Sequence, residues 1–118
     1  MSADQNSSGS DRLKMIEEML VTNPDDPFLQ YASALEYRKI GDTPKAIELL
    51  ESLRAKNADY LGTYYQLGKL YEDSGEVDKA LAVYREGRDV AEKQSDQKTL
   101  GELSEALKRR CLYLFVDY

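Results

Sequence analysis

The chain has 118 residues, 42% of them hydrophobic and 32% charged, and 16 basic against 22 acidic residues give a formal net charge of −6. This length suits one domain, and the negative charge disfavours nucleic acid and anionic membranes as partners. The sequence has no histidine and one cysteine, which excludes an intrachain disulfide, a cysteine-based zinc site and histidine-dependent nucleophilic catalysis.

The N-terminal ten residues are small and polar, and we expect residues 1–10 to be a disordered tail. They lack the apolar segment of a secretory signal, and no apolar run reaches the ~20 residues of a membrane span. We therefore expect a cytoplasmic protein. The spacing of Leu13, Ile16, Met19 and Leu20 then predicts a one-sided helix over 11–23.

The second helix has a clear start and a clear end in the sequence. Asp26 followed by Pro27 is typical of a helix N-terminus. The helix is expected to run to about Ile40 and to end at Gly41, because glycine adopts the left-handed conformation most easily. A third helix over about 43–56 follows, with Asp42 or Thr43 as its cap.

Three more helices follow, and the sequence signals for where they begin and end are weaker. The fourth, over about 61–74, is closed by Gly75, and the fifth has no breaker between Val77 and about Ser95. The last helix is expected over 97–116, with a capping box at 99–102. The sequence therefore predicts an all-α chain of about six helices.

The chain also repeats itself with a period of 34 residues. Aligning 27–58 with 61–92 gives six identities. They are Tyr31/Tyr65, Tyr37/Tyr71, Gly41/Gly75, Lys45/Lys79, Ala46/Ala80 and Arg54/Arg88. Two helices in each period of this length are typical of stacked helix hairpins. Helices this short do not persist alone in water, so neighbouring hairpins must stabilise one another.

The second copy resembles the tetratricopeptide repeat (TPR) family. The matching positions are Tyr64, Leu67, Gly68, Tyr71, Gly75, Ala80 and Tyr84. The first copy keeps Ala34, Tyr37, Gly41, Ala46 and Leu50. It departs at Gln30 and Ser33, where the family usually has an aromatic residue and a leucine, so its first helix is expected to pack less tightly.

The resemblance implies a fold and an organisation. The fold is an antiparallel helix-hairpin array in a right-handed α-solenoid, with residues 11–118 as a single TPR domain. Its parts are a half-repeat helix over 11–23, repeat 1 over 27–60, repeat 2 over 61–94 and a capping helix over 97–116.

The resemblance also implies a function. TPR modules are non-catalytic and bind a peptide or helix of another protein on a concave face, which the first helix of each hairpin lines. The matching residues are Phe28, Tyr31, Leu35, Arg38, Lys39, Tyr65, Lys69, Glu72 and Asp73. In the alternative, the tyrosines only pad an unoccupied groove. A clamp for C-terminal carboxylates is not expected, because its matching positions carry no Lys or Asn.

Other features have plainer interpretations. Carboxylate pairs such as Glu72-Asp73 are interpreted as solvated charge, and no enzyme, cofactor or metal is expected. Cys111 is interpreted as a structural thiol, and the basic residues 108–110 as a complement to a helix C-terminus. The apolar segment 111–118 is expected to pack as the last turns of the chain. In the alternative it forms a homodimer contact through Leu112, Leu114 and Phe115.

Overall fold

A computed structural model describes the backbone of residues 2–116 and the side chains of residues 11–110. Within that range all regular secondary structure is α-helical, and there is no strand. The helices are α1 (Ser2–Thr22), α2 (Pro27–Lys39), α3 (Thr43–Lys56), α4 (Gly62–Asp73), α5 (Val77–Lys93) and α6 (Gln97–Val116).

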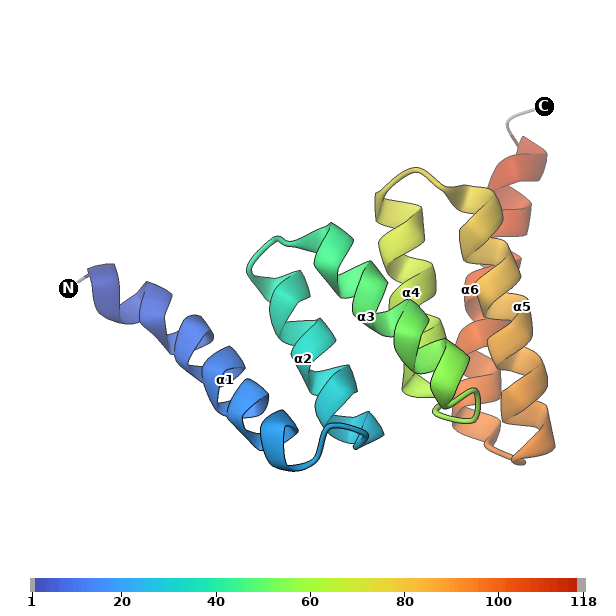
Figure 1. Cartoon of the computed structure of the whole chain (residues 1–118). Coiled ribbons are helices and arrows are strands. Elements are labelled where there is room, and N and C mark those ends of the chain that lie inside the picture. Colours follow the sequence, from blue (N-terminus) through green and yellow to red (C-terminus); the bar gives the residue numbers. More distant parts are fainter. Residues whose placement is uncertain (1, 117–118) are drawn as a thin grey trace. The chain divides into compact units, whose positions relative to one another are not determined.

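The chain forms two compact units, residues 1–57 and 58–118. The first contains α1, α2 and α3, and the second contains α4, α5 and α6. Within each unit, consecutive helices run antiparallel and lie side by side (Figure 1). Each unit is described by itself below. A single domain over 11–118 stays a prediction.

Two aspartates start helices as the sequence predicts. Asp26 accepts a hydrogen bond from the backbone N–H of Phe28 at 2.9 Å, and Asp42 accepts one from Lys45 at 3.2 Å. Each bond satisfies a backbone donor that the first turn of a helix leaves unpaired.

Three helices end with the same backbone turn. The turn residues Gly41, Gly75 and Ser95 have φ values of 88°, 80° and 58°. The residue after each one donates to a carbonyl five residues before it, which is the Schellman arrangement. These bonds are Asp42 to Tyr37 (2.9 Å), Glu76 to Tyr71 (2.8 Å) and Asp96 to Ala91 (3.0 Å). The two glycines confirm the predicted helix ends.

The helix starts differ from the sequence analysis at two places. The capping box expected at 99–102 is wrong, because α6 begins earlier and Asp96 accepts from the N–H of Thr99 at 3.0 Å. At the other end, α1 begins at Ser2, whereas a helix was expected only from residue 11. The disordered tail over 1–10 stays a prediction, and the side chains of those residues lie outside the described range.

The helix contacts within each hairpin depend on small residues. Ala34, Ala46 and Ala80 are fully buried. A Cβ added to Gly68 would come within 2.6 Å of ring carbons of Tyr84, a distance that real Cβ atoms do not show. The absence of a side chain at Gly68 therefore lets the buried ring of Tyr84 lie directly on the backbone of α4.

A second glycine has the same role on the partner helix. A Cβ at Gly87 on α5 would lie 2.7 Å from Cγ of Tyr64, which is fully buried on α4. The α4–α5 hairpin is thus held by two rings, each seated on a glycine of the opposite helix. Buried aromatic rings provide the largest apolar contacts available to a short helix.

Candidate functional site

In unit 1 the predicted binding residues form one row along α2. Phe28 is 64% exposed and Lys39 is exposed, whereas Tyr31, Leu35 and Arg38 are half-buried. Spacings of three and four residues place them on one helix face. The row is apolar at the start of α2 and basic at its end.

Other residues of α2 contact α1 through polar groups. Glu36 is 5% exposed, and its Oε2 lies 3.5 Å from Nζ of Lys39 and 3.9 Å from Nη1 of Arg12 on α1. Tyr37 donates a hydrogen bond to Glu17 on α1 at 2.9 Å. That bond, then burial and the nearby negative charges, raise the pKa of Tyr37.

The first hairpin replaces the expected aromatic residue with an equivalent polar contact. Gln30 stands where the second copy has Tyr64, and its Nε2 donates to the carbonyl of Pro24 at 2.8 Å. Tyr64 donates through its hydroxyl to the carbonyl of Ala58, which lies 34 residues after Pro24. Both side chains thus tie the start of a hairpin to the segment before it.

In unit 2 the predicted binding residues lie along α4. The ring of Tyr65 is half-buried, with its centroid 6.3 Å from that of Tyr84. Lys69 is half-buried and Asp73 is exposed. Glu72 differs from them, because its side chain is only 9% exposed and is engaged by two other helices.

The contacts of Glu72 join all three helices of unit 2. Tyr84 on α5 donates to Oε1 of Glu72, and on α6 Nε of Arg110 lies 2.8 Å from Oε2 while Nη2 of Arg109 lies 3.8 Å from Oε1. Burial, then the hydrogen bond and charge of Glu72, raise the pKa of Tyr84. Glu72 therefore stabilises the packing of α6, and its carboxylate is already occupied.

This cluster was not predicted from the sequence. Residues 108–110 were expected to complement a helix C-terminus, but α6 continues to Val116. The missed signal is an offset of 36 residues between α4 and α6. At that offset, buried Leu103 and Leu107 match buried Leu67 and Tyr71.

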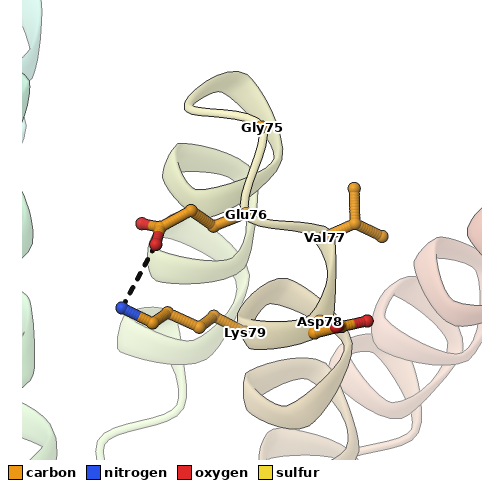
Figure 2. A pocket seen from close by; sticks show the side chains of 5 residues that line it. All are labelled: Gly75, Glu76, Val77, Asp78 and Lys79. Carbon is orange, nitrogen blue, oxygen red and sulfur yellow. Dashed lines mark ion pairs between the residues drawn. The ribbon is translucent and has the colours of Figure 1, made fainter.

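The turn between α4 and α5 has a shallow open depression of about 370 Å³, lined by Gly75, Glu76, Val77, Asp78 and Lys79. Figure 2 shows the Glu76–Lys79 pair on one side and the side chains of Val77 and Asp78 pointing away from it. The two charges lie 3.2 Å apart, and Nζ of Lys79 lies 5.6 Å from the centre of the Tyr71 ring. These groups satisfy one another, and we assign no chemistry to the depression.

In the part of the chain that the structure describes, no three His, Cys, Asp or Glu side chains come together as a metal ion would need. None of its helices combines the length and the apolar character required to cross a membrane.

Two parts of the predicted site stay predictions. The row on α2 and the residues on α4 belong to different units, so a groove shared by both copies is not established. The side chains of Cys111, Leu112, Leu114 and Phe115 lie outside the described residues.

Known proteins with related sequences share the repeat. A TPR repeat-containing protein of Methanocaldococcus jannaschii is 35% identical over 81 residues, which are 69% of this chain and 25% of that protein. A solution structure of a tetratricopeptide repeat domain protein from Salinibacter ruber is 43% identical, with a TM-score of 0.71, over 73% of this chain and 87% of that one. This chain thus spans a quarter of the first protein and most of the second.

A more distant solved structure shows the same fold. It is PcrH in complex with the chaperone binding region of PopD, at 12% identity and a TM-score of 0.78, over 92% of this chain and 82% of that one. Together with the helix order, these structures confirm the all-α helix-hairpin array.

The family model of the tetratricopeptide repeat matches residues 39–108, which is more than half of the chain. Modules of this family are typically non-enzymatic and act in protein–protein interaction. The sequence resemblance is thereby confirmed, and the chain belongs to the tetratricopeptide repeat family.

Proposed function

We propose that this protein is a non-catalytic interaction module that binds a peptide or helix of another protein. The binding surfaces, here called the inner faces, are the row of residues on α2 and the predicted binding residues Tyr65, Lys69 and Asp73 on α4. The row on α2 is the observation that carries the proposal. Phe28 keeps 64% of its surface exposed, and the half-buried Tyr31 and Leu35 continue the apolar row toward Lys39. Apolar and aromatic side chains on one helix face suit capture of an amphipathic segment.

The residues on α4 have a narrower role in this proposal. Tyr65 and Lys69 are half-buried and Asp73 is exposed, so all three retain surface for a partner. Glu72 is not proposed to contact the partner, because Tyr84 and Arg110 already engage its carboxylate. Its role in the proposal is to stabilise the packing of unit 2. With few hairpins the contact is small, and we expect affinity on the order of micromolar.

The fold itself is compatible with this use. PcrH, which has the same fold, was solved in complex with the chaperone binding region of PopD. That observation concerns PcrH, and the partner of the present chain is to be found by experiment.

Affinity capture followed by a direct binding measurement tests the proposal. The wild type and a Tyr31→Ala/Tyr65→Ala/Lys69→Glu variant are used to capture partners, and the minimal binding segment of each partner is titrated by calorimetry. A matched control, Ser52→Ala/Arg85→Ala/Lys93→Glu, changes exposed residues of α3 and α5. We expect the first variant to lose affinity at least tenfold and the control to keep it. Equal affinity of all three folded proteins would exclude the inner faces as the site.

Self-association through the C-terminal segment is the second candidate, and its observation is the apolar sequence of residues 111–116. If Leu112, Leu114 and Phe115 form a homodimer contact, Leu114→Glu converts a dimer to a monomer in sedimentation velocity. A dimer that survives this substitution is held elsewhere.

A further inference from the structure

We infer that α1 is a self-association surface on which α1 of a second copy packs antiparallel. The starting observation is that Met15 and Met19 are 57% and 47% exposed although they are large and apolar. They lie four residues apart and therefore on one face of the helix. Val21, also exposed, lies on a different face.

In the repeat, α1 occupies the place of a second helix of a hairpin. At the 34-residue offset, Met15 and Met19 match Leu49 and Leu53 on α3. Leu53 is buried there, with 1% of its surface exposed. The same helix face is thus covered in the α2–α3 hairpin and uncovered on α1.

A first helix of a further hairpin is a poor occupant for this face. Such a helix packs closely on a small residue, and Ala46 and Ala80 are fully buried at that position of α3 and α5. On α1 the matching residue is Arg12, which is largely exposed and contacts Glu36. A long charged side chain there holds a neighbouring helix away, so the occupant must pack against the methionines at a larger distance.

The charges beside the methionines favour a second copy of α1. Lys14 and Glu18 are exposed, lie along one edge of the methionine face, and make no ion pair with a described residue. In an antiparallel pair of identical helices, the same edge of each copy faces the other. Centring the pair between residues 16 and 17 brings Lys14 within one residue of facing Glu18 of the second copy, and Met15 within one residue of facing Met19, each twice by symmetry.

This contact does not depend on the proposed binding faces of α2 and α4. One helix per copy is a small interface, so we expect a dissociation constant on the order of 10–100 micromolar. Two isologous ion pairs at the rim would fix the antiparallel register while the methionines supply the apolar contact.

Charge reversal with rescue tests the inference on the full chain. Sedimentation velocity is measured over concentrations up to roughly 1 mM, which spans the expected dissociation constant. We expect the wild type to dimerise and Met15→Lys/Met19→Lys to be monomeric. Lys14→Glu or Glu18→Lys alone should weaken the dimer at least tenfold, and the double reversal should restore it. These residues are exposed, so helicity by circular dichroism should stay unchanged.

Lys98→Glu, which makes the same charge change at an exposed position of α6, is the matched control and should leave the dimer intact. A wild type that stays monomeric overturns the inference, as does a double reversal that fails to restore association. Loss of the dimer by Leu114→Glu but not by the methionine variant would place the contact at the C-terminal segment instead. None of these outcomes affects partner binding by α2, so the two proposals can fail separately.

Discussion

The hairpins α2–α3 and α4–α5 share a backbone plan but differ in the sizes of the residues that are paired across it. In unit 2, Gly68 accepts the ring of Tyr84 on the partner helix. In unit 1 the matching residues are Ala34 and Leu50, both fully buried. The smaller Leu50 leaves room for the alanine methyl group, so the two members of each pair must change together.

The two units also differ in how the hairpin meets a third helix. In unit 2, apolar residues are buried on both α5 and α6, for example Ala91 and Leu103. The largely buried Glu72 of α4 also pairs with Arg110 of α6. In unit 1, α2 meets α1 through the ion pair of Glu36 with Arg12 and the bond from Tyr37 to Glu17. Each unit thus has a largely buried acid at the contact with its third helix, and the ion pair to that helix is closer in unit 2 (2.8 Å) than in unit 1 (3.9 Å).

The largest expected effect on stability comes from giving unit 2 the alanine that unit 1 has at the matching position, Ala34. Gly68→Ala pushes a methyl group into the ring of Tyr84, and overpacking of this kind costs about 1–3 kcal/mol in unfolding free energy. Combined with Tyr84→Leu, which recreates the pair of unit 1, the same alanine should be neutral or stabilise by about 0.5–1 kcal/mol through helix propensity. Urea unfolding of the four proteins of this double-mutant cycle measures the coupling.

The matched change in unit 1 is Ala34→Gly, which should cost about 1 kcal/mol from helix propensity and lost contacts. If Gly68→Ala instead stabilises the wild-type background, the ring of Tyr84 can move away from α4. The two hairpins would then not differ in the way described above.

Tyr37 and Tyr84 each donate a hydrogen bond to a carboxylate, and their contributions to stability should differ at alkaline pH. An unfolded tyrosine ionises near its ordinary pKa of 10.0, whereas folding raises the pKa of Tyr84. The stabilisation from Tyr84 is therefore fully present below pH 10 and is lost as pH rises through the folded pKa, at up to about 1.4 kcal/mol per pH unit. The pKa of Tyr37 is raised in the same direction, but its side chain is less buried, so its effect should be smaller.

Urea unfolding at several alkaline pH values, compared among the wild type, Tyr84→Phe and Tyr37→Phe, checks this order. Tyr84→Phe should flatten the alkaline loss of stability more than Tyr37→Phe does. It should also cost about 1–3 kcal/mol at neutral pH, because Oε1 of Glu72 loses its donor. Equal slopes in all three proteins would show that Tyr84 ionises freely in the folded state.

Replacing the buried acid of unit 1 should stabilise the α1–α2 contact. Glu36 stands where unit 2 has the buried Leu70, and its Oε1 has no hydrogen-bond partner among the described residues. Glu36→Leu removes the cost of burying that group and should raise the unfolding free energy by about 1 kcal/mol. Glu36→Gln keeps a polar group in place and should give no gain. A loss of more than about 1 kcal/mol for the leucine variant would show that the ion pairs with Arg12 and Lys39 outweigh burial.

Much of the fold could be predicted because local signals agree with the repeat. Glycine recurs at 41 and 75, one 34-residue period apart, and its positive φ explains why a helix ends at each place. Within the two hairpins, proline and a capping aspartate mark the helix starts only in α2 and α3. The Asp96 cap of α6 was missed because the 34-residue period does not extend to that helix. Helix α5 has 17 residues against 14 in α3, and the buried residues of α6 match those of α4 at an offset of 36 instead.

The candidate site could be predicted less well, because it depends on contacts between helices. The row on α2 follows from helix periodicity, and its exposed Phe28 is visible once the fold is known. The engagement of Glu72 by Arg110 joins residues 38 positions apart on α4 and α6, and neither residue stands out locally. The uncovered methionines of α1 likewise depend on which neighbour is present, which sequence periodicity does not report.

The smallest expected effect on stability concerns the acidic residue in each of the two hairpin turns. Asp42 and Glu76 have nearly the same backbone angles, φ −87° and ψ 72° against φ −96° and ψ 71°. Only the aspartate caps its helix, by accepting from the N–H of Lys45, whereas the longer Glu76 reaches Nζ of Lys79 instead (Figure 2). The length of the acidic side chain therefore decides whether it caps the helix or forms a surface ion pair.

Exchanging the two acids should exchange these contacts. Glu76→Asp should create a cap bond to the N–H of Lys79 and stabilise by about 0.5–1 kcal/mol, because a cap contributes more than an exposed ion pair. Asp42→Glu should lose a similar amount, and amide exchange in the first turns of α3 and α5 locates both changes. If Glu76→Asp leaves the exchange of the Lys79 amide unchanged, the turn of unit 2 does not accept the cap, and the two turns differ in more than the length of one side chain.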